Sequence, residues 1–456
     1  MSRLSVSSRL AKLSDRQRAK ALKRSISRRK VKRVIRRVRP HARQCPVVPD
    51  EMVVWLIIGL GLFCGDAARQ VWRWLVPASA DLSVPRRNTL CMARQRLGTR
   101  VMIELAKVVL HPLAGPDTPG ACYCGMPLRS IDCVNLSLYD SPENRRVFNP
   151  PRPPRRRNRG GRRRPAPAFP QAKLCALAEC GTHAVYQWGL KPVHWADSNM
   201  APPLLRHLEK NQLLMWDAAF YSHQNLQQVL EKEAHLLGRL NWTHEPRHIR
   251  TLSDGSYLAR LTHERGKPGP VVRIIQYTLP GMSCGRHKNH RLLTTLLDEK
   301  QHPAQTLAEL YHNRWEIELT IDELETHQLQ QRVMASQTPA GVVQEVAGLL
   351  MAHWLIRQLM FEASAKAQVS PLRISFVGTL KILRCRLGEA GATPASHRAW
   401  WKRLIDEVTG EVIEPRRSRT NPRVLKRTTF DFKKKKPGDY NPSPPAKFCD
   451  AFAILR

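Results

Sequence analysis

The sequence lacks an apolar run long enough to cross a membrane. Its longest apolar run extends from Met52 to Cys64, which is shorter than the roughly 20 residues that a spanning helix requires. The N-terminus begins with basic residues but has no apolar signal core, so export is not expected. These absences argue against a membrane protein and predict a cytoplasmic protein in which the Met52–Cys64 run forms a buried helix.

The eleven cysteines lack the paired C-x2-C spacing of structural zinc sites. The clusters that come nearest to one are Cys122 with Cys124, and Cys175 and Cys180 with His183. Scattered cysteines of this kind are expected to be reduced and mostly buried in a cytoplasmic protein.

Acidic residues are scarce, since 37 Asp and Glu face 75 Lys and Arg and leave a net charge of +38. That excess is larger than solubility requires and indicates a polyanionic partner, in the first place nucleic acid. A membrane surface is the competing partner, but the basic residues are not confined to one amphipathic helix. Aromatic residues make up only 6% of the chain and no RNA-stacking motif is present, which disfavours an RNA-binding protein.

The first 115 residues divide into a basic arm and a helical domain. Residues 1–45 are strongly basic, are expected to be helical from Leu10 to Val38, and would bind a phosphate backbone without sequence preference. Residues 46–115 are expected to form a helical DNA-binding domain, with Asp50 as the first helix cap. The expected helices span Met52 to Phe63, Ala67 to Leu75, Asn88 to Leu97 and Thr99 to Leu110.

Two arginines of the third of these helices, Arg94 and Arg96, are candidates for DNA contact. Short helices around an arginine-bearing one are typical of a helix-turn-helix reader. An ordinary helical bundle fits the pattern equally well.

A linker at 111–120 separates the helical domain from a region that is rich in strands. Strand followed by aspartate and then helix is the order of an RNase H-like α/β core, which we place at 121–340. An arginine-rich loop at 150–165 and a β insertion at about 233–300, with a hairpin turn at Asp254-Gly255, interrupt this core. The expected strands are Leu128 to Leu138, Arg145 to Phe148, Lys173 to Ala178, Ala184 to Leu190 and Gln212 to Trp216, with a helix from Pro202 to Glu209.

The C-terminal part is expected to hold helices at 340–362 and about 370–386, within a helical region at 341–410. The first of these helices is a candidate dimer contact, and packing in the core is the favoured alternative. Its apolar residues are Val342, Val346, Leu349, Leu350, Trp354 and Ile356. Residues 411–456 are basic and proline-rich, which predicts a mobile tail.

The stretch from Tyr311 to Glu325 contains no glycine or proline and is expected to form one helix. Tyr311, Arg314, Glu318 and Glu325 would share one face of that helix. An arginine fork suits a phosphate group, and a carboxylate suits a hard cation such as Mg²⁺. The face could therefore hold a phosphodiester beside a metal ion; the alternative is a solvated helix with internal salt bridges.

Two aspartates occupy positions where a carboxylate is costly unless it is paired or bound to metal. Asp132 lies inside an apolar strand, and Asp217 ends another. Each could instead be a hydrogen-bonded core residue or a cap. Transfer at a phosphodiester uses two divalent cations about 4 Å apart, and Glu318 would supply the third carboxylate.

The motif Tyr311-x2-Arg314-x3-Glu318 resembles the signature of the insertion element 4 family of bacterial DDE transposases. Further matching motifs follow in the same order along residues 47–384. They are Val53-Val-Trp-Leu-Ile-Ile-Gly59, Ala93-Arg-Gln-Arg-Leu-Gly98, Ile131-Asp132, Asp140-Ser-Pro-Glu-Asn144, Ala168-Phe-Pro-Gln171, Glu179-Cys-Gly-Thr-His183, Trp216-Asp217-x2-Phe-Tyr221 and Arg291-Leu-Leu-Thr-Thr-Leu-Leu297.

This resemblance implies a transposase with an RNase H-like core and a catalytic triad of Asp132, Asp217 and Glu318. The triad would hold Mg²⁺, with Mn²⁺ as an alternative, and Tyr311 and Arg314 would contact the DNA backbone near the scissile phosphate. The implied partners are double-stranded DNA, as terminal inverted repeats and target, and a second copy of the chain on paired ends. The implied location is cytoplasmic, at the bacterial nucleoid.

The chain departs from the family signature at Glu325, where the family has a lysine. Glu325 could point away from the DNA, Arg332 could compensate for it, or the enzyme could be weakened. A catalytically silent DNA-binding protein is therefore the alternative function. A tyrosine recombinase using Tyr221 or Tyr311 is disfavoured, because only Arg314 and His312 would surround its nucleophile.

Overall fold

The computed structural model describes residues 26–41, 48–75, 84–149, 169–262, 268–278, 289–312, 314–389, 394–414 and 453–455. The chain divides into two units. The first unit comprises Met1–His207 and Trp315–Ile413, and the second comprises Leu208–Arg314 and Glu414–Arg456. The predicted mixed α/β class is confirmed.

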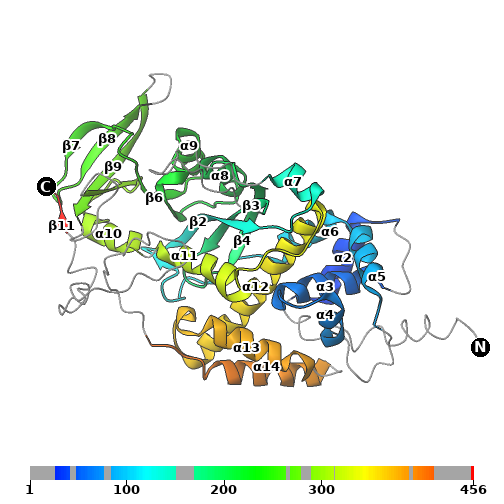
Figure 1. Ribbon diagram of the computed structural model, residues 1–456. Helices are drawn as coiled ribbons and strands as arrows, with labels where there is room; N and C mark the ends of the chain where they lie inside the picture. The colour runs from blue at the N-terminus through cyan, green and yellow to red at the C-terminus, as the bar shows by residue number, and fades with distance from the viewer. Residues whose placement is uncertain are drawn as a thin grey trace, which may run out of the picture. The chain divides into compact units, whose positions relative to one another are not determined.

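Helices form the N-terminal part of the first unit, as predicted (Figure 1). Helix α3 is largely apolar and is buried on nearly all sides, whereas α2 buries only Val31 and Val34. The predicted cap was wrong, because Pro49 is the N-cap of α3 and Asp50 is its first residue. The helices are α2 (Arg28–Val38), α3 (Asp50–Leu62), α4 (Ala68–Leu75), α5 (Arg87–Leu97) and α6 (Thr99–Val109).

The sheet strands of the first unit pair in antiparallel fashion in the order β1, β2, β3, β4. They are β1 (Cys122–Tyr123), β2 (Met126–Ser137), β3 (Gln171–Glu179) and β4 (Val185–Pro192). The strands predicted at Leu128 to Leu138, Lys173 to Ala178 and Ala184 to Leu190 are therefore confirmed. The predicted arginine-rich loop at 150–165 falls outside the described residues.

Two local predictions in this region were wrong. The residues expected to form a strand at Arg145 to Phe148 lie in helix α7 (Pro142–Phe148). Ser141 caps that helix by accepting a hydrogen bond from the Asn144 N–H at 3.2 Å, and a proline suits the first helical turn. The helix expected at Pro202 to Glu209 is α8 (Asp197–Leu205), which begins earlier and ends earlier.

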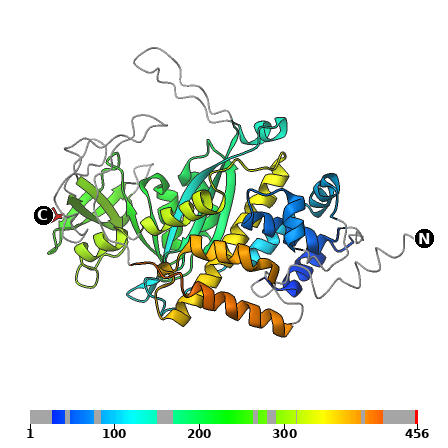
Figure 2. The ribbon, with the colours of Figure 1, turned by 60° about the horizontal axis from the view of Figure 1, so that its bottom comes forward.

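The C-terminal part of the first unit is helical and built on α12 (Pro339–Ala367). This helix packs against α3, α6, α13 (Phe376–Arg386) and α14 (Pro394–Val408), and Figure 2 shows α13 and α14 alongside one another. The six apolar residues of the predicted 340–362 helix are all buried in the unit, so core packing accounts for them. By length and composition α12 could span a membrane, but 72% of its apolar window is buried within the protein, as in a core helix.

The strands of the second unit follow the order β5-β6-β10-β9-β8-β7, with β11 beside β9. Among the described strands of this unit, only β5 and β6 pair in parallel, and α9 (His223–Glu231) joins them. The strands predicted at about 233–300 are confirmed, and the predicted Asp254-Gly255 turn joins β7 to β8. The strands are β5 (Leu213–Trp216), β6 (His235–Arg239), β7 (Arg247–Thr251), β8 (Tyr257–Thr262), β9 (Pro268–Thr278), β10 (Asn289–Thr294) and β11 (Ala453–Ile454).

Strand β11 corrects part of the prediction for the chain's end. Ala453 and Ile454 pair with Thr278 and Tyr277 of β9, although a mobile tail was expected there. Residues 415–452 and the part of the basic arm before Ile26 lie outside the described residues, and helix α2 confirms only the end of the predicted arm helix.

The stretch from Tyr311 to Glu325 is not one continuous α-helix, so this prediction was wrong. Helix α10 (Ala304–His312) ends in the second unit, and α11 (Trp315–Asp322) begins in the first unit. A π-helix, Glu323–Gln328, continues α11 and contains the wide-turn hydrogen bond from the Leu329 N–H to the Leu324 carbonyl at 2.9 Å. Local helix propensity could not reveal these changes, because packing in two different units decides them.

Candidate active site

Asp132 lies in the middle of β2, where Ala176 of β3 is its cross-strand neighbour. Its side chain is half-buried, and its Oδ1 accepts a hydrogen bond from the Cys133 N–H at 2.7 Å. A carboxylate has room for several acceptor contacts, so this backbone bond is compatible with an additional cation.

Glu318 lies on α11, which packs directly against β2. The first unit therefore brings together the two elements that carry Asp132 and Glu318. The Glu318 side chain is half-buried, in contrast to the neighbouring Ile317, which is 1% exposed.

Asp217 belongs to the second unit, where it follows β5 as predicted. Its Oδ1 accepts a hydrogen bond from the Ala218 N–H at 2.5 Å and so caps a short 3₁₀ turn, Ala218–Phe220. This is the strand-end cap that the sequence offered as the structural alternative. One backbone bond of this kind leaves acceptor capacity on the carboxylate.

Tyr311 lies close to Asp217 within the second unit, Arg314 lies close to Tyr311, and both residues are buried. The Tyr311 hydroxyl donates to the Trp216 carbonyl at 3.1 Å, and the Arg314 guanidinium carbon lies 5.7 Å from the centre of the Tyr311 ring. Burial raises the pKa of Tyr311, and the nearby Asp217 raises it further. The geometry thus gives Tyr311 a contact next to Asp217, while a DNA contact by either residue stays a prediction.

A buried ionic cluster, which was not anticipated from the sequence, lies against α11 and the π-helix in the first unit. His183 Nε2 lies 2.7 Å from Glu316 Oε2, and His183 Nδ1 lies 3.0 Å from Glu323 Oε1. Glu323 also pairs with Arg357, whose Nε donates to Glu323 Oε2 at 2.9 Å, and contacts His353 Nε2 at 3.1 Å. The motif ending in His183 was recognised in the sequence, but no local pattern could indicate its partners.

The electrostatics of this cluster centre on Glu323, which is 6% exposed. Burial acts to raise the pKa of Glu323, but the charge of Arg357 and the contacts with His183 outweigh burial and hold that pKa well below its ordinary value. Burial lowers the pKa of His353. Glu323 is therefore an anion that is enclosed by cationic and hydrogen-bonding groups.

Arg94 and Arg96, expected to contact DNA, are engaged within the first unit. Arg94 donates to Ser336 Oγ at 3.1 Å and to the Gly341 carbonyl at 3.2 Å. Arg96 donates to the Val48 carbonyl at 2.5 Å and pairs with Asp50 at 3.2 Å. These bonds account for both arginines structurally, and a role in DNA binding stays a prediction for them.

Glu325, the residue that departs from the family signature, lies within the π-helix and is half-buried. Burial raises its pKa, and the negative charge of Asp322 raises it further. No ion pair between Glu325 and Arg332 occurs among the described residues, and Arg332 instead lies against Gly65. The compensation by Arg332 that the sequence suggested is therefore not seen in the first unit.

Carboxylates such as those of Asp132, Asp217 and Glu318 are the donors that hard divalent cations prefer. Asp132 and Glu318 belong to one unit and Asp217 to the other, so their convergence stays a prediction. Across the described ranges, no group of three His, Cys, Asp or Glu side chains is assembled to hold a metal. The donor chemistry fits a divalent cation, and His183 is already engaged with Glu316 and Glu323.

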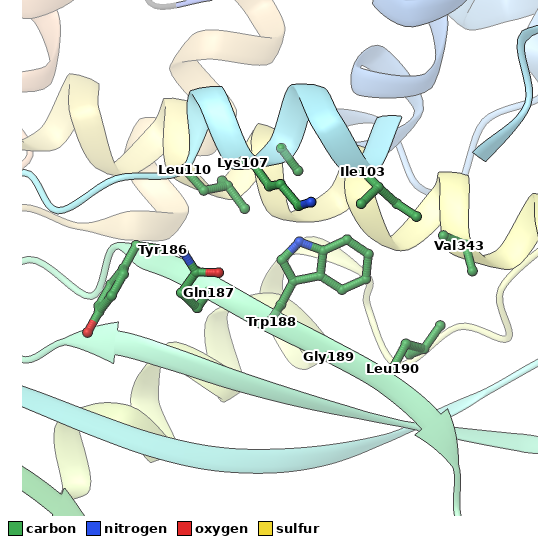
Figure 3. Close-up of a pocket in the computed structure, with 10 residues that line it drawn as sticks. Ile103, Lys107, Leu110, Tyr186, Gln187, Trp188, Gly189, Leu190 and Val343 are labelled. Carbon is green, nitrogen blue, oxygen red and sulfur yellow. The ribbon is translucent and has the colours of Figure 1, made fainter. Parts of the chain in front are cut away.

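The first unit also contains a pocket of about 260 Å³, and none of the three proposed carboxylates lines it. Figure 3 shows the Trp188 ring of β4 facing side chains of α6, among them Lys107. Tyr186, Leu190 and Ile103 contribute to a mainly apolar lining. The pocket contains none of the residues predicted for the site.

Comparisons with known proteins define the class. The family described as "Transposase DDE domain" matches residues 149–355, and "Insertion element 4 transposase N-terminal" matches residues 16–107. The first match includes Asp217 and Glu318 but begins after Asp132. The chain is a DDE transposase, an enzyme class that acts on DNA and depends on a divalent cation.

Relatives narrow the class to a family. Transposase InsG for insertion sequence element IS4 of Escherichia coli K12 is 27% identical over 405 residues, which cover 84% of this chain and 87% of InsG. Putative transposase InsZ of the same strain is 23% identical over 227 residues, or 48% of this chain and 72% of InsZ. The chain belongs to the insertion element 4 family and is an insertion-sequence transposase.

The chain was also compared with solved structures. One that matches is the piggyBac transposase synaptic complex with hairpin DNA, with a match over 87% of this chain and 85% of that chain at 10% identity. The TM-score of this match is 0.40.

Proposed function

We propose that Asp132, Asp217 and Glu318 form the catalytic triad of this transposase within an RNase H-like core. The observation that carries the proposal is the packing of α11, which bears Glu318, directly on β2, which bears Asp132. Asp217 at the end of β5 supplies the third carboxylate from the second unit. Mg²⁺ is the proposed cation and Mn²⁺ the alternative, because both accept oxygen donors.

The proposed reaction has two steps at phosphodiester bonds. In the first step, a water oxygen bonds to phosphorus at the transposon end, the bond to the 3′ oxygen breaks, and that oxygen leaves as a 3′-OH. In the second step, the freed 3′-OH oxygen bonds to a target phosphorus and displaces the 3′ oxygen of the target strand. Asp132, Asp217 and Glu318 would hold the divalent cations, which would supply activation of the attacking oxygen and stabilisation of the leaving oxygen.

Neither step uses a tyrosine as nucleophile, in keeping with the state of the two candidate tyrosines. Burial raises the pKa of Tyr221 to about 12, and the Tyr311 hydroxyl is already bonded to the Trp216 carbonyl. We propose that Tyr311 fixes the backbone next to Asp217 and leaves any phosphate contact near the site to Arg314.

Helix α2 offers a surface for DNA in the first unit. Its arginines Arg29, Arg33 and Arg36 are at least partly exposed, and their spacing places them on one helical face. We call them the α2 basic face. The opposite side is anchored through Val31 and Val34. Such a face suits a phosphate backbone, whose affinity comes from released counterions.

We further propose that residues 46–115 form the DNA-binding domain, and that two copies of the chain act on paired transposon ends. A catalytically silent DNA-binding protein is the second candidate, favoured by the carboxylate at Glu325 where the family has lysine.

The test is end cleavage with purified protein, Mg²⁺ and the DNA that flanks the coding region. Asp217→Asn should abolish cleavage and preserve DNA binding, since asparagine can still accept the Ala218 N–H. The matched control is Asp298→Asn, an exposed residue of the same unit whose carboxylate accepts the Lys300 N–H at 2.8 Å. Cleavage that survives Asp217→Asn would contradict the triad, and binding without cleavage by the unaltered protein would favour the silent alternative.

A further inference from the structure

The residues that surround Glu318 in sequence are fixed by the buried cluster of His183, Glu316, Glu323, His353 and Arg357. The cluster joins four segments of the first unit. These are the turn after β3, helix α11, the π-helix and helix α12. The proposed triad uses none of the five side chains, although Glu316 lies only two residues from Glu318.

Helical geometry explains why this proximity matters. Each residue turns an α-helix by about 100°, so Glu316 and Glu318 point to nearly opposite sides of α11. Glu316 is held by His183 at 2.7 Å, on the side of α11 that faces the turn after β3. Once Glu316 is fixed there, Glu318 must face the other side of the helix, and both side chains are half-buried.

The second attachment lies one heptad later. Glu316 and Glu323 are seven residues apart and so share a helical face. His183 Nε2 lies 2.7 Å from Glu316, whereas His183 Nδ1 lies 3.0 Å from Glu323 and accepts from Arg357 Nη2 at 2.5 Å. Arg357 holds Glu323 with its planar fork from α12, a geometry that specifies orientation as well as charge. Two anchors on one face fix both the rotation and the axial position of α11.

The π-helix begins at the anchor residue Glu323. Wide helical turns of this kind are rare and occur often at functional sites. The wide turn changes the register of every later residue, including Glu325. The cluster thus lies where the helix that carries Glu318 passes from α to π geometry.

We propose that His183, Glu323 and Arg357 are positioning residues that hold α11 in the rotation presenting Glu318 to the reaction. This inference rests on the proposed role of Glu318 in the triad. It assigns no contact with DNA or metal to the cluster itself. Residues that orient a metal ligand from behind typically change metal affinity or activity by about 10–100-fold when they are replaced.

The test compares two amide replacements of His183, which has a positive φ of 58°. In His183→Gln, the terminal amide can reach the position of Nε2 and keep the bond to Glu316. In His183→Asn, the shorter side chain tolerates the positive φ well but cannot reach Glu316. The control is Glu362→Gln on α12, whose carboxylate accepts the Trp401 indole N–H at 2.7 Å.

Four quantities are measured on each full-length variant. They are the thermal midpoint, hydrogen exchange of the backbone amides of residues 315–328 without metal, DNA-end binding, and the cleavage rate in Mg²⁺. His183→Asn should exchange faster in residues 315–328 and cleave about 10–100-fold more slowly, with DNA binding unchanged. His183→Gln should retain cleavage to within a few fold, and Glu362→Gln should match the unaltered protein in both exchange and cleavage.

Several outcomes would overturn the proposal. Unchanged exchange in residues 315–328 of His183→Asn would show that the cluster does not hold α11. Equal loss of cleavage in the two amide variants, or loss of DNA binding in parallel with the thermal midpoint, would reduce the cluster to a stability element. If the unaltered protein fails to cleave, the proposed function fails, while the exchange data still decide whether the cluster holds α11.

Discussion

Gly61→Ala should destabilise the first unit, because Gly61 lies where α3 crosses α12 without room for a side chain. A Cβ at Gly61 would lie 2.7 Å from the Gly348 carbonyl carbon and 2.8 Å from the Leu349 nitrogen. Ordinary contact begins at 3.4 Å, so the two helices would have to separate by several tenths of an ångström. Both neighbours are backbone atoms, which cannot rotate away as a side chain would.

The crossing is also held by a buried amide. Gln328 Nε2 donates to the Gly61 carbonyl at 2.7 Å and to the Leu349 carbonyl at 3.0 Å. Overpacking costs about 1–3 kcal/mol, and strained or lost hydrogen bonds of Gln328 cost about 1 kcal/mol more. Alanine returns about 1 kcal/mol through its helix propensity, which leaves a net loss on the order of 1–3 kcal/mol.

Thermal unfolding followed by circular dichroism measures this loss. A domain of about 150–250 residues loses roughly 2–4 °C of Tm per kcal/mol, so a fall of about 2–12 °C is expected. Gly388→Ala is the matched control, because a Cβ there meets no atom within 4 Å. An unchanged Tm for Gly61→Ala, or an equal fall for Gly388→Ala, would refute the argument from the helix crossing.

Three further predictions concern other parts of the chain. Burial, with the charge of Arg239, lowers the pKa of His290 from 6.5 to about 4; the unfolded chain therefore binds more protons in this range. The second unit should lose stability as the pH falls from 6.5 through 4, and an unchanged pH slope in His290→Asn would contradict this origin. Asp254→Ala leaves the fully buried Arg273 without its ion pair. The free energy of unfolding measured in urea should therefore fall by about 3 kcal/mol. A fall below about 1 kcal/mol would mean that the other hydrogen bonds of Arg273 suffice. Alanine at all three positions of the α2 basic face should weaken binding to any DNA sequence and reduce the salt dependence of log K by about 0.9 per lost phosphate contact; an unchanged salt slope would exclude this face.

The sequence alone determined the elements whose side-chain pattern is local. The apolar and β-compatible residues from Leu128 to Leu138 predicted β2 around Asp132, and the apolar run before Asp217 predicted β5. Burial on one or both faces imposes such patterns directly on the residues. The family signature predicted a DDE transposase, and the matches to the DDE domain and to InsG confirmed that class. The triad stays a prediction.

Local patterns misled where a neighbour in space decides the structure. The stretch from Tyr311 to Glu325 has the composition of a single helix, yet it ends and restarts at the boundary between the two units. Tyr311 is anchored by the Trp216 carbonyl, which no helical period encodes. Likewise, no local pattern indicated that Ser336 and Gly341 engage the Arg94 guanidinium, and the DNA contact of Arg94 stays a prediction.

The buried cluster shows most clearly what only the tertiary structure decides. His183, Glu323 and Arg357 are far apart in the chain, and each would pass for a solvated polar residue in its own segment. Their mutual contacts arise because the turn after β3, the π-helix and α12 pack together. The sequence determined which residues can carry charge, whereas folding decided which of those charges are enclosed.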